Sequence, residues 1–271
     1  MTQTPEQPDK QPDGASTSQT LIDHLLELRR RLLRIIGAAL GVFILLMVTP
    51  AYRYLYDWVA APLMNVMPHG TSMIATHVTS PLLVPMELAF YVSLFVTMPY
   101  TLHQIWAFIS PGLYQREKKL AAPLLVSSVL LFYAGCAFAY FVIFPLLFKF
   151  FTSIAPDGVA VMTDIGSYLS FVITLFIAFG VAFEMPVFII LLVASGLVTH
   201  AQLVRARRYV IVGCFIVAMF ITPPDMFSQT LLAIPMCLLY EVGLIFARGI
   251  KGRSKDDEDT SNKENGENGE K

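Results

Sequence analysis

Residues 166–197, GSYLSFVITLFIAFGVAFEMPVFIILLVASGL, contain one acidic residue, Glu184, and no basic residue. A helix needs about 20 apolar residues to cross the hydrocarbon core of a bilayer, and this stretch is longer. Further apolar segments lie at roughly 32–51, 82–109, 122–150, 208–222 and 227–247. In the whole chain of 271 residues, 55% are hydrophobic and 14% are charged. This composition excludes a soluble globular enzyme and a disordered chain. It predicts an all-α, polytopic membrane protein with six transmembrane helices.

The fifth segment is the shortest, and Thr222-Pro223-Pro224-Asp225 separates it from the sixth. Two consecutive prolines cannot continue a helix, and Asp225 can cap the next one, so these segments should form a tight helical hairpin. The fifth segment holds about 15 residues, which rise only ~22 Å, less than the ~30 Å hydrocarbon core. We therefore expect the bilayer to thin or tilt locally around it.

Basic residues are distributed unevenly between the two sides of this topology. Of 19 lysines and arginines, only Arg53 and Lys149 fall on the side away from the termini. The positive-inside rule therefore places both termini in the cytoplasm. The polar residues 1–19 and the acidic residues 251–271 are predicted to be disordered cytoplasmic tails around a membrane domain at 20–250, and no cleavable signal peptide is expected.

Residues 20–34, TLIDHLLELRRRLLR, have the pattern of an amphipathic helix whose T-x-x-D start lies at Thr20. Glu27 in this helix has two interpretations. It can pair with Arg31, four residues later, in a merely interfacial helix. It can also form, with Glu117 of the first inner loop, an acidic site. Such carboxylates accept forked hydrogen bonds from the arginines of a partner.

Glu184 is the strongest polar signal inside the membrane. A carboxylate at that depth costs several kcal/mol unless it is protonated, paired or in contact with water. Pro186 lacks the N–H that would bond to the Ala182 carbonyl and should kink the helix. The sequence favours a polar contact inside a cavity or binding groove. The alternative is a neutral carboxyl group that is hydrogen-bonded to a neighbouring helix.

Motifs of enzymes and metal sites are missing. The chain has no Gly-Lys pair of a Walker A loop and no Gly-x-Ser-x-Gly elbow, and its five histidines lack ligand spacing. We therefore predict no catalytic residue, no cofactor, no metal and no nucleic-acid partner. The three cysteines lie in apolar segments and are interpreted as packing residues. The Gly37-x-x-x-Gly41 pattern is interpreted as close helix packing.

Six stretches, in their order along the chain, resemble the TatC family, the large integral subunits of the twin-arginine protein translocase. They are HLLELRRRL at 24–32, WAFISPGLYQREKK at 106–119, LLFYAGCAFAYFVIFP at 130–145, DIGSYLSF at 164–171, FGVAFEMP at 179–186 and TPPDMFSQTLLAIPMCLLYEVG at 222–243. The similarity covers essentially residues 20–248 and spares only the two polar tails.

The resemblance implies a cupped bundle of six helices, with short helices five and six, that acts as a receptor rather than an enzyme. Such proteins bind twin-arginine signal peptides and form the core scaffold of a translocase. The translocase moves folded proteins across the bacterial cytoplasmic (inner) membrane, driven by the proton-motive force. The implied partners are the single-span subunits TatA and TatB, membrane lipid and further copies of the chain in a larger complex.

The resemblance also assigns residues to three roles. Signal-peptide binding falls to Glu27, Arg29, Phe108 and Glu117. Functional positions inside or beside the membrane are Glu184, Asp225, Pro62, Pro99, Tyr140 and Asp164. Contacts with the partner subunits are Met219, Thr222 and Gln229. The alternative function is a proton-coupled secondary transporter of a small solute with Glu184 as its coupling site. That function predicts an internal repeat, and we find no convincing one.

Overall fold

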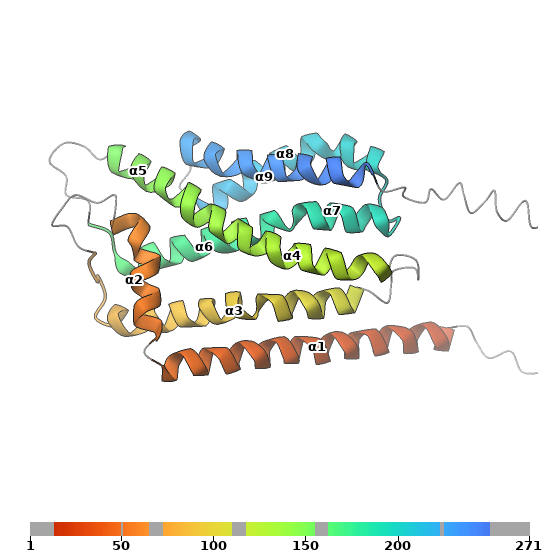
Figure 1. The fold of residues 1–271 in the computed structure, drawn as a ribbon, viewed down its shortest axis with the longest axis horizontal. Helices are drawn as coiled ribbons and strands as arrows, with labels where there is room; N and C mark the ends of the chain where they lie inside the picture. The colour runs from red at the N-terminus through yellow and green to blue at the C-terminus, as the bar shows by residue number, and fades with distance from the viewer. Residues whose placement is uncertain are drawn as a thin grey trace, which may run out of the picture.

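The computed structural model describes residues 14–49, 51–64, 73–109, 118–154, 162–222 and 225–249. In these ranges the chain is helical apart from short connections and one isolated parallel bridge between Ile74 and Asp164. The elements in chain order are α1 (Gly14–Val48), α2 (Ala51–Met64), α3 (Ser80–Ile109), α4 (Lys118–Phe138), the π-helical η2 (Ala139–Ile143), α5 (Phe144–Ile154), α6 (Ile165–Phe183), α7 (Met185–Ala194), α8 (His200–Ile221) and α9 (Met226–Ala247). Their long axes run side by side, and the short α2 crosses them at one end (Figure 1).

Five stretches of the described chain are long and apolar enough to cross a membrane. They are Leu25–Val48, Ser80–Phe108, Ala122–Ile154, Ile165–Ala194 and Met226–Ala247. Each coincides with one of the predicted segments, so the prediction of an all-α membrane protein with several spans is confirmed. Helix α8, whose first half carries three arginines, is not among them. The count of six spans therefore stays a prediction.

The predicted bounds of the fifth helix are wrong. Helix α8 has 22 residues, as many as α9, and begins at His200 rather than near residue 208. The cause is a capping box, in which the Thr199 side chain accepts from the backbone of Gln202 and the Gln202 side chain accepts from the backbone of Thr199. A helix of this length rises about 33 Å. The added first turns carry Arg205, Arg207 and Arg208, so the apolar part of α8 stays short and the local thinning of the bilayer remains a prediction.

One prediction for the first helix is also wrong, and a second finds no support within the described chain. Helix α1 begins at Gly14, so Thr20 lies inside the helix and not at its N-terminal cap. A Cβ atom added at Gly37 or Gly41 would meet nothing within 4 Å, so these glycines are not sites of close packing within the described chain. Helix α1 packs along α3, and most of its surface is exposed (Figure 1).

Helices α6 and α7 form the interior of the bundle. Helix α6 ends at Phe183 and α7 begins at Met185, so the helix breaks beside Pro186, as the sequence predicts. Two glycines let neighbouring helices approach closely. A Cβ atom at Gly135 of α4 would lie 2.5 Å from the Phe179 carbonyl oxygen of α6, and one at Gly243 of α9 would lie 3.0 Å from Cα of Pro186.

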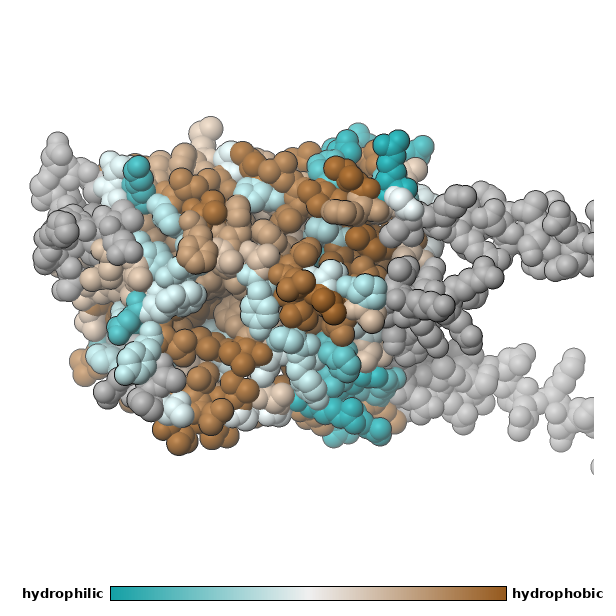
Figure 2. Space-filling model, in the orientation of Figure 1, coloured by the Kyte–Doolittle hydropathy of each residue, from teal (hydrophilic) through white to brown (hydrophobic). Residues whose placement is uncertain are grey.

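The two ends of the bundle differ in charge. We call the end at which α1 and α8 begin the basic end. Its described arginines are Arg29, Arg30, Arg31, Arg34, Arg205, Arg207, Arg208 and Arg248. Hydrophilic residues gather at this end on the right of Figure 2, whereas hydrophobic ones cover the middle of the molecule. We call the other end, which carries α2 and the start of α6, the distal end.

Candidate functional site

Glu27 lies on α1 at the basic end, and an arginine of the same helix occupies its carboxylate. Oε1 of Glu27 accepts hydrogen bonds from Nε of Arg31 at 3.0 Å and from Nη2 at 2.6 Å. Nη1 of the same guanidinium donates to Oε1 of Gln104 on α3 at 3.1 Å. Gln104 is buried. The predicted pair of Glu27 and Arg31 is confirmed, and it also ties α1 to α3.

The other residues assigned to signal-peptide binding differ in burial, and one of them lies outside the described residues. Phe108 is half-buried on α3, four residues after Gln104, and therefore lies on the same side of that helix one turn further on. Arg29 is exposed on α1. Glu117 lies outside the described residues. The structure therefore brings Glu27, Arg29 and Phe108 to one end of the α1–α3 pair.

Glu184 is the residue that joins α6 to α7. Its Oε1 atom is buried and has no hydrogen-bond partner among the described residues. The Ser128 hydroxyl of α4 lies beside the carboxyl group and accepts a hydrogen bond from Nε1 of Trp106 on α3 at 3.2 Å. A buried oxygen without a partner is costly, so this position can accept a donor from outside the described chain. The hydroxyl beside it fits a neutral carboxyl group equally, so both interpretations of Glu184 stay open.

Pro62 and Tyr140 act together at the distal end. Pro62 lies inside α2 and has no N–H, so the carbonyl of Trp58, four residues earlier, loses its helical partner. The Tyr140 hydroxyl of η2 donates to that carbonyl at 3.0 Å, and its ring stacks on Trp58 with centroids 4.3 Å apart. The Tyr168 hydroxyl of α6 donates to the next carbonyl, that of Val59, at 2.7 Å. These contacts hold α2 against the bundle.

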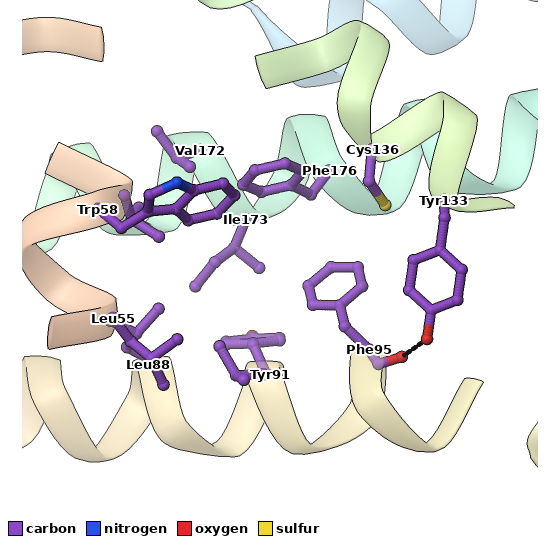
Figure 3. A pocket seen from close by; sticks show the side chains of 12 residues that line it. Leu55, Trp58, Leu88, Tyr91, Phe95, Tyr133, Cys136, Val172, Ile173 and Phe176 are labelled. Atoms are coloured by element: carbon purple, nitrogen blue, oxygen red, sulfur yellow. Dashed lines mark hydrogen bonds between the residues drawn. The ribbon is translucent and has the colours of Figure 1, made fainter. Parts of the chain in front are cut away.

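Pro99 follows the same rule inside α3. It frees the carbonyl of Phe95, and the Tyr133 hydroxyl of α4 donates to that oxygen at 2.9 Å (Figure 3). This bond lies at the edge of an apolar cavity of about 170 Å³ between α2, α3, α4 and α6. The residues that line the cavity include Leu55, Trp58, Leu88, Phe95, Tyr133 and Ile173.

Asp164 clamps two connections at the distal end. Its Oδ1 accepts from the backbone N–H groups of Gly166 and Ser167, which caps α6. Its Oδ2 accepts from the backbone N–H of Thr76 at 3.0 Å and from the Thr76 hydroxyl at 2.8 Å. The hydrogen bonds from Ser167 and Thr76 hold the pKa of this carboxyl group well below its usual value. Asp164 therefore joins the segment before α3 to the start of α6.

The residues assigned to partner contacts lie in the α8–α9 hairpin. Asp225 caps α9 by accepting from the Ser228 N–H at 2.7 Å, which confirms the predicted cap. The Gln229 amide donates to the Phe215 carbonyl of α8 at 3.0 Å. The Thr222 hydroxyl is buried and donates to a carbonyl of its own helix, whereas Met219 is exposed. Of these residues, Met219 presents the most surface to a partner.

Comparisons with known proteins agree with this architecture. The family model described as Sec-independent protein translocase protein (TatC) matches residues 23–235. The chain belongs to the TatC family. Among its relatives is a TatC of Azotobacter chroococcum mcd 1, 57% identical over 87% of this chain and 91% of that protein. Another is the TatC of Escherichia coli strain K12, 52% identical over 89% of this chain and 93% of that protein.

A solved structure supports the fold of this TatC-family chain directly. A crystal structure of the twin-arginine translocase receptor TatC superposes with a TM-score of 0.74 at 36% identity and covers 83% of this chain and 98% of that one. The chain is thus a bacterial membrane protein and a component of a protein translocase. The alternative of a solute transporter finds no support in these comparisons.

Sequence reasoning missed three polar residues that this TatC-family fold uses. They are Gln104, Ser128 and Tyr133, which bond Arg31, Trp106 and the Phe95 carbonyl. A signal for Tyr133 was present, because each proline inside a helix leaves an open carbonyl four residues earlier and a tyrosine in an apolar segment needs an acceptor. No sequence spacing links Gln104 to Arg31, since 73 residues separate them.

Proposed function

We propose that this chain is the twin-arginine signal-peptide receptor and the core scaffold of a translocase that moves folded proteins across the bacterial cytoplasmic membrane, driven by the proton-motive force. The observation that carries the proposal is the half-buried Glu27 carboxylate at the basic end, in a chain of the TatC family. A relative with this fold is named a twin-arginine translocase receptor. The role requires binding and not bond chemistry, in keeping with the absence of catalytic motifs from the sequence.

The chemistry of the site supports an arginine-bearing ligand. Arg31 already donates two hydrogen bonds to Oε1 of Glu27, so the carboxylate is oriented to accept a guanidinium. A lysine ammonium cannot make that fork, which gives a reason for selecting Arg-Arg over Lys-Lys. We propose that Glu117 supplies a second carboxylate, that Arg29 shapes the charge around the pair, and that Phe108 offers an apolar contact to the peptide.

We further propose an orientation with six spans and both termini in the cytoplasm, so that the basic end faces the signal peptide before export. The single-span subunits TatA and TatB would bind the α8–α9 hairpin, where Met219 is exposed. Thr222 and Gln229 would support that surface from within the hairpin. Glu184, with one buried oxygen unpaired among the described residues, would accept a donor from the peptide or from a partner helix.

The test is binding of an Arg-Arg signal peptide to the purified full chain in nanodiscs, with a Lys-Lys peptide as the ligand control. Glu27→Gln and Glu117→Gln should each weaken Arg-Arg binding about tenfold or more, because each removes a charged acceptor. Glu241→Gln is the matched control. Glu241 also pairs with an arginine, Arg207, and is 39% exposed against 38% for Glu27.

Unchanged affinity in both variants, with equal binding of the two peptides, would contradict the proposed receptor site. The same assay is then repeated with TatB present, because recognition could require that subunit. If Arg-Arg preference is still absent, or is lost equally in Glu241→Gln, the carboxylate site is wrong.

A further inference from the structure

Arg31 contacts Glu27 through its guanidinium group, and the arginines of the proposed peptide ligand would present the same group. Both bonds from Arg31 end on one oxygen of Glu27, at 3.0 Å and 2.6 Å. The Arg31 side chain is 19% exposed, so this guanidinium is largely withdrawn from water. An arginine that arrives from a peptide therefore meets a carboxylate already occupied by a guanidinium.

A peptide arginine that forks onto both oxygens of Glu27 needs Oε1, which Arg31 occupies, and any second cation there meets the positive charge of Arg31. Binding of a peptide arginine in this forked geometry therefore displaces Arg31 from Oε1 of Glu27. Arg31 has a second acceptor, since its Nη1 donates to Gln104 at 3.1 Å. Gln104 is 6% exposed on α3, so it stays in place when the arginine leaves Glu27.

We propose that Arg31 is an internal competitor of the signal peptide, and that it sets the affinity of the receptor by occupying Glu27 in the free protein. This inference rests on the proposed function of Glu27. The peptide binds only those molecules in which Arg31 has left Glu27, so the apparent dissociation constant equals the intrinsic one divided by that fraction. Arg31 thereby acts as a gate on the site, with Gln104 as the residue that holds it when displaced.

A competitor of this kind has a thermodynamic signature. Its removal raises the affinity for every ligand that uses Glu27 by the same factor, because the competent fraction does not depend on which peptide arrives. Arg31→Leu should therefore strengthen binding of Arg-Arg and of Lys-Lys peptides about fivefold to tenfold each, if the pair has the strength of a charge-assisted fork. The ratio of the two affinities should not change.

Charge alone could imitate part of this effect, and two variants separate the causes. Arg34 lies in the same basic cluster as Glu27 and Arg31, so Arg34→Leu removes one positive charge from the site without removing the Glu27 contact. Arg31→Lys keeps the charge but loses the fork. We expect little gain from Arg34→Leu and a clear gain from Arg31→Lys.

The experiment measures both peptides against wild type, Arg31→Leu, Arg31→Lys and Arg34→Leu as full chains in nanodiscs, with thermal unfolding as the folding control. The double variant Glu27→Gln, Arg31→Leu should lose the gain, since the gain acts through Glu27. Equal gains in Arg34→Leu and Arg31→Leu, or weaker binding in Arg31→Leu, would overturn the gate.

The proposed function and the gate fail in different ways. Binding that depends on Glu27 but ignores Arg31→Leu leaves the receptor site intact and removes the gate. Binding that ignores Glu27→Gln in both the wild-type and the Arg31→Leu background removes the receptor site, and the gate falls with it.

Discussion

Helices α1 and α6 are both apolar enough to span a membrane, yet they are held in opposite ways. In an apolar 18-residue stretch of Leu25–Val48, 6% of the residues are buried. In the corresponding stretch of Ile165–Ala194, which contains α6 and α7, 50% of the residues are buried. Helix α1 packs mainly along α3, whereas α6 contacts α3, α4, α8 and α9. Two spans that are both apolar enough to cross a membrane can therefore pack very differently against the rest of the chain.

The difference lies in small and polar side chains. Gly135 of α4 lies directly against the Phe179 backbone of α6, and Gly180 of α6 lies against the Phe132 ring of α4. These reciprocal contacts interlock the two helices. Helix α1 has glycines at Gly37 and Gly41, one helical turn apart, but no described residue packs on them. At the basic end, the hydrogen bond from Arg31 to Gln104 helps to attach α1 to α3.

The sharpest test of this comparison exchanges a glycine for alanine in each region. Gly135→Ala would place a methyl group 2.5 Å from a backbone oxygen, so α4 and α6 must separate. We expect a loss of about 1–3 kcal/mol in the free energy of unfolding. Gly41→Ala, with open space around its Cβ position, should be neutral or stabilise the helix by up to about 1 kcal/mol. Thermal unfolding in the same detergent compares the two variants.

Gly180→Ala provides an intermediate case, because the obstacle is a phenylalanine ring that can turn rather than backbone. Its loss should fall between those of the other two variants. If Gly41→Ala destabilises as much as Gly135→Ala, α1 packs on another surface that the isolated chain does not contain, and the contrast between the two helices is not intrinsic.

Sequence patterns predicted the elements well, because apolar length and proline positions act locally. The five spans, the break at Pro186 and the cap at Asp225 all followed from such rules. The start of α8 was missed because hydropathy fades at the arginines, whereas the Thr199 capping box continues the helix upstream. The same limitation applied to α1, which begins at Gly14 in polar sequence.

Part of the candidate site was predictable because it depends on spacing within one helix. The Glu27–Arg31 pair spans one helical turn, so spacing predicts it. Contacts between distant segments, such as those of Gln104 and Tyr133, depend on which helices become neighbours. Spacing within one helix contains no information on which helices become neighbours. The family resemblance marked Pro62, Pro99 and Tyr140, and the structure adds that the prolines open carbonyls which tyrosines then occupy.

A second test concerns the attachment of α3 to the interlocked pair. Tyr133→Phe removes the donor to the Phe95 carbonyl and should cost about 1 kcal/mol of unfolding free energy. Pro99→Ala restores an N–H that can reach the same carbonyl. The double variant should therefore lose less than the sum of the two single variants, and thermal unfolding of all three gives the coupling.

Additive losses would mean that the tyrosine does not compensate for the proline. Tyr100→Phe serves as a control, because Tyr100 follows Pro99 on α3 and is as exposed as Tyr133, 39% against 40%. A loss in that variant as large as in Tyr133→Phe would show a general effect of removing a hydroxyl from these spans.

The smallest expected effect lies at the distal end, where Asp164 joins the segment before α3 to the start of α6. Its pKa is lower in the folded chain than the usual 3.8, because Ser167 and Thr76 donate to the carboxylate. A lowered pKa stabilises the fold above the unfolded pKa, and that stabilisation is lost as the pH falls below about 4. Asp164→Asn cannot titrate and cannot accept both Thr76 bonds, so it should resemble the acid form at every pH. Thermal unfolding from pH 7 to pH 3 should therefore show the wild type falling towards the variant, while the gap between them closes in acid. A difference in stability between wild type and variant that stays constant with pH would mean that the shape of Asp164, and not its charge, holds the segment before α3 to the start of α6. The distal attachment of α3 would then be steric, like the contact between α4 and α6.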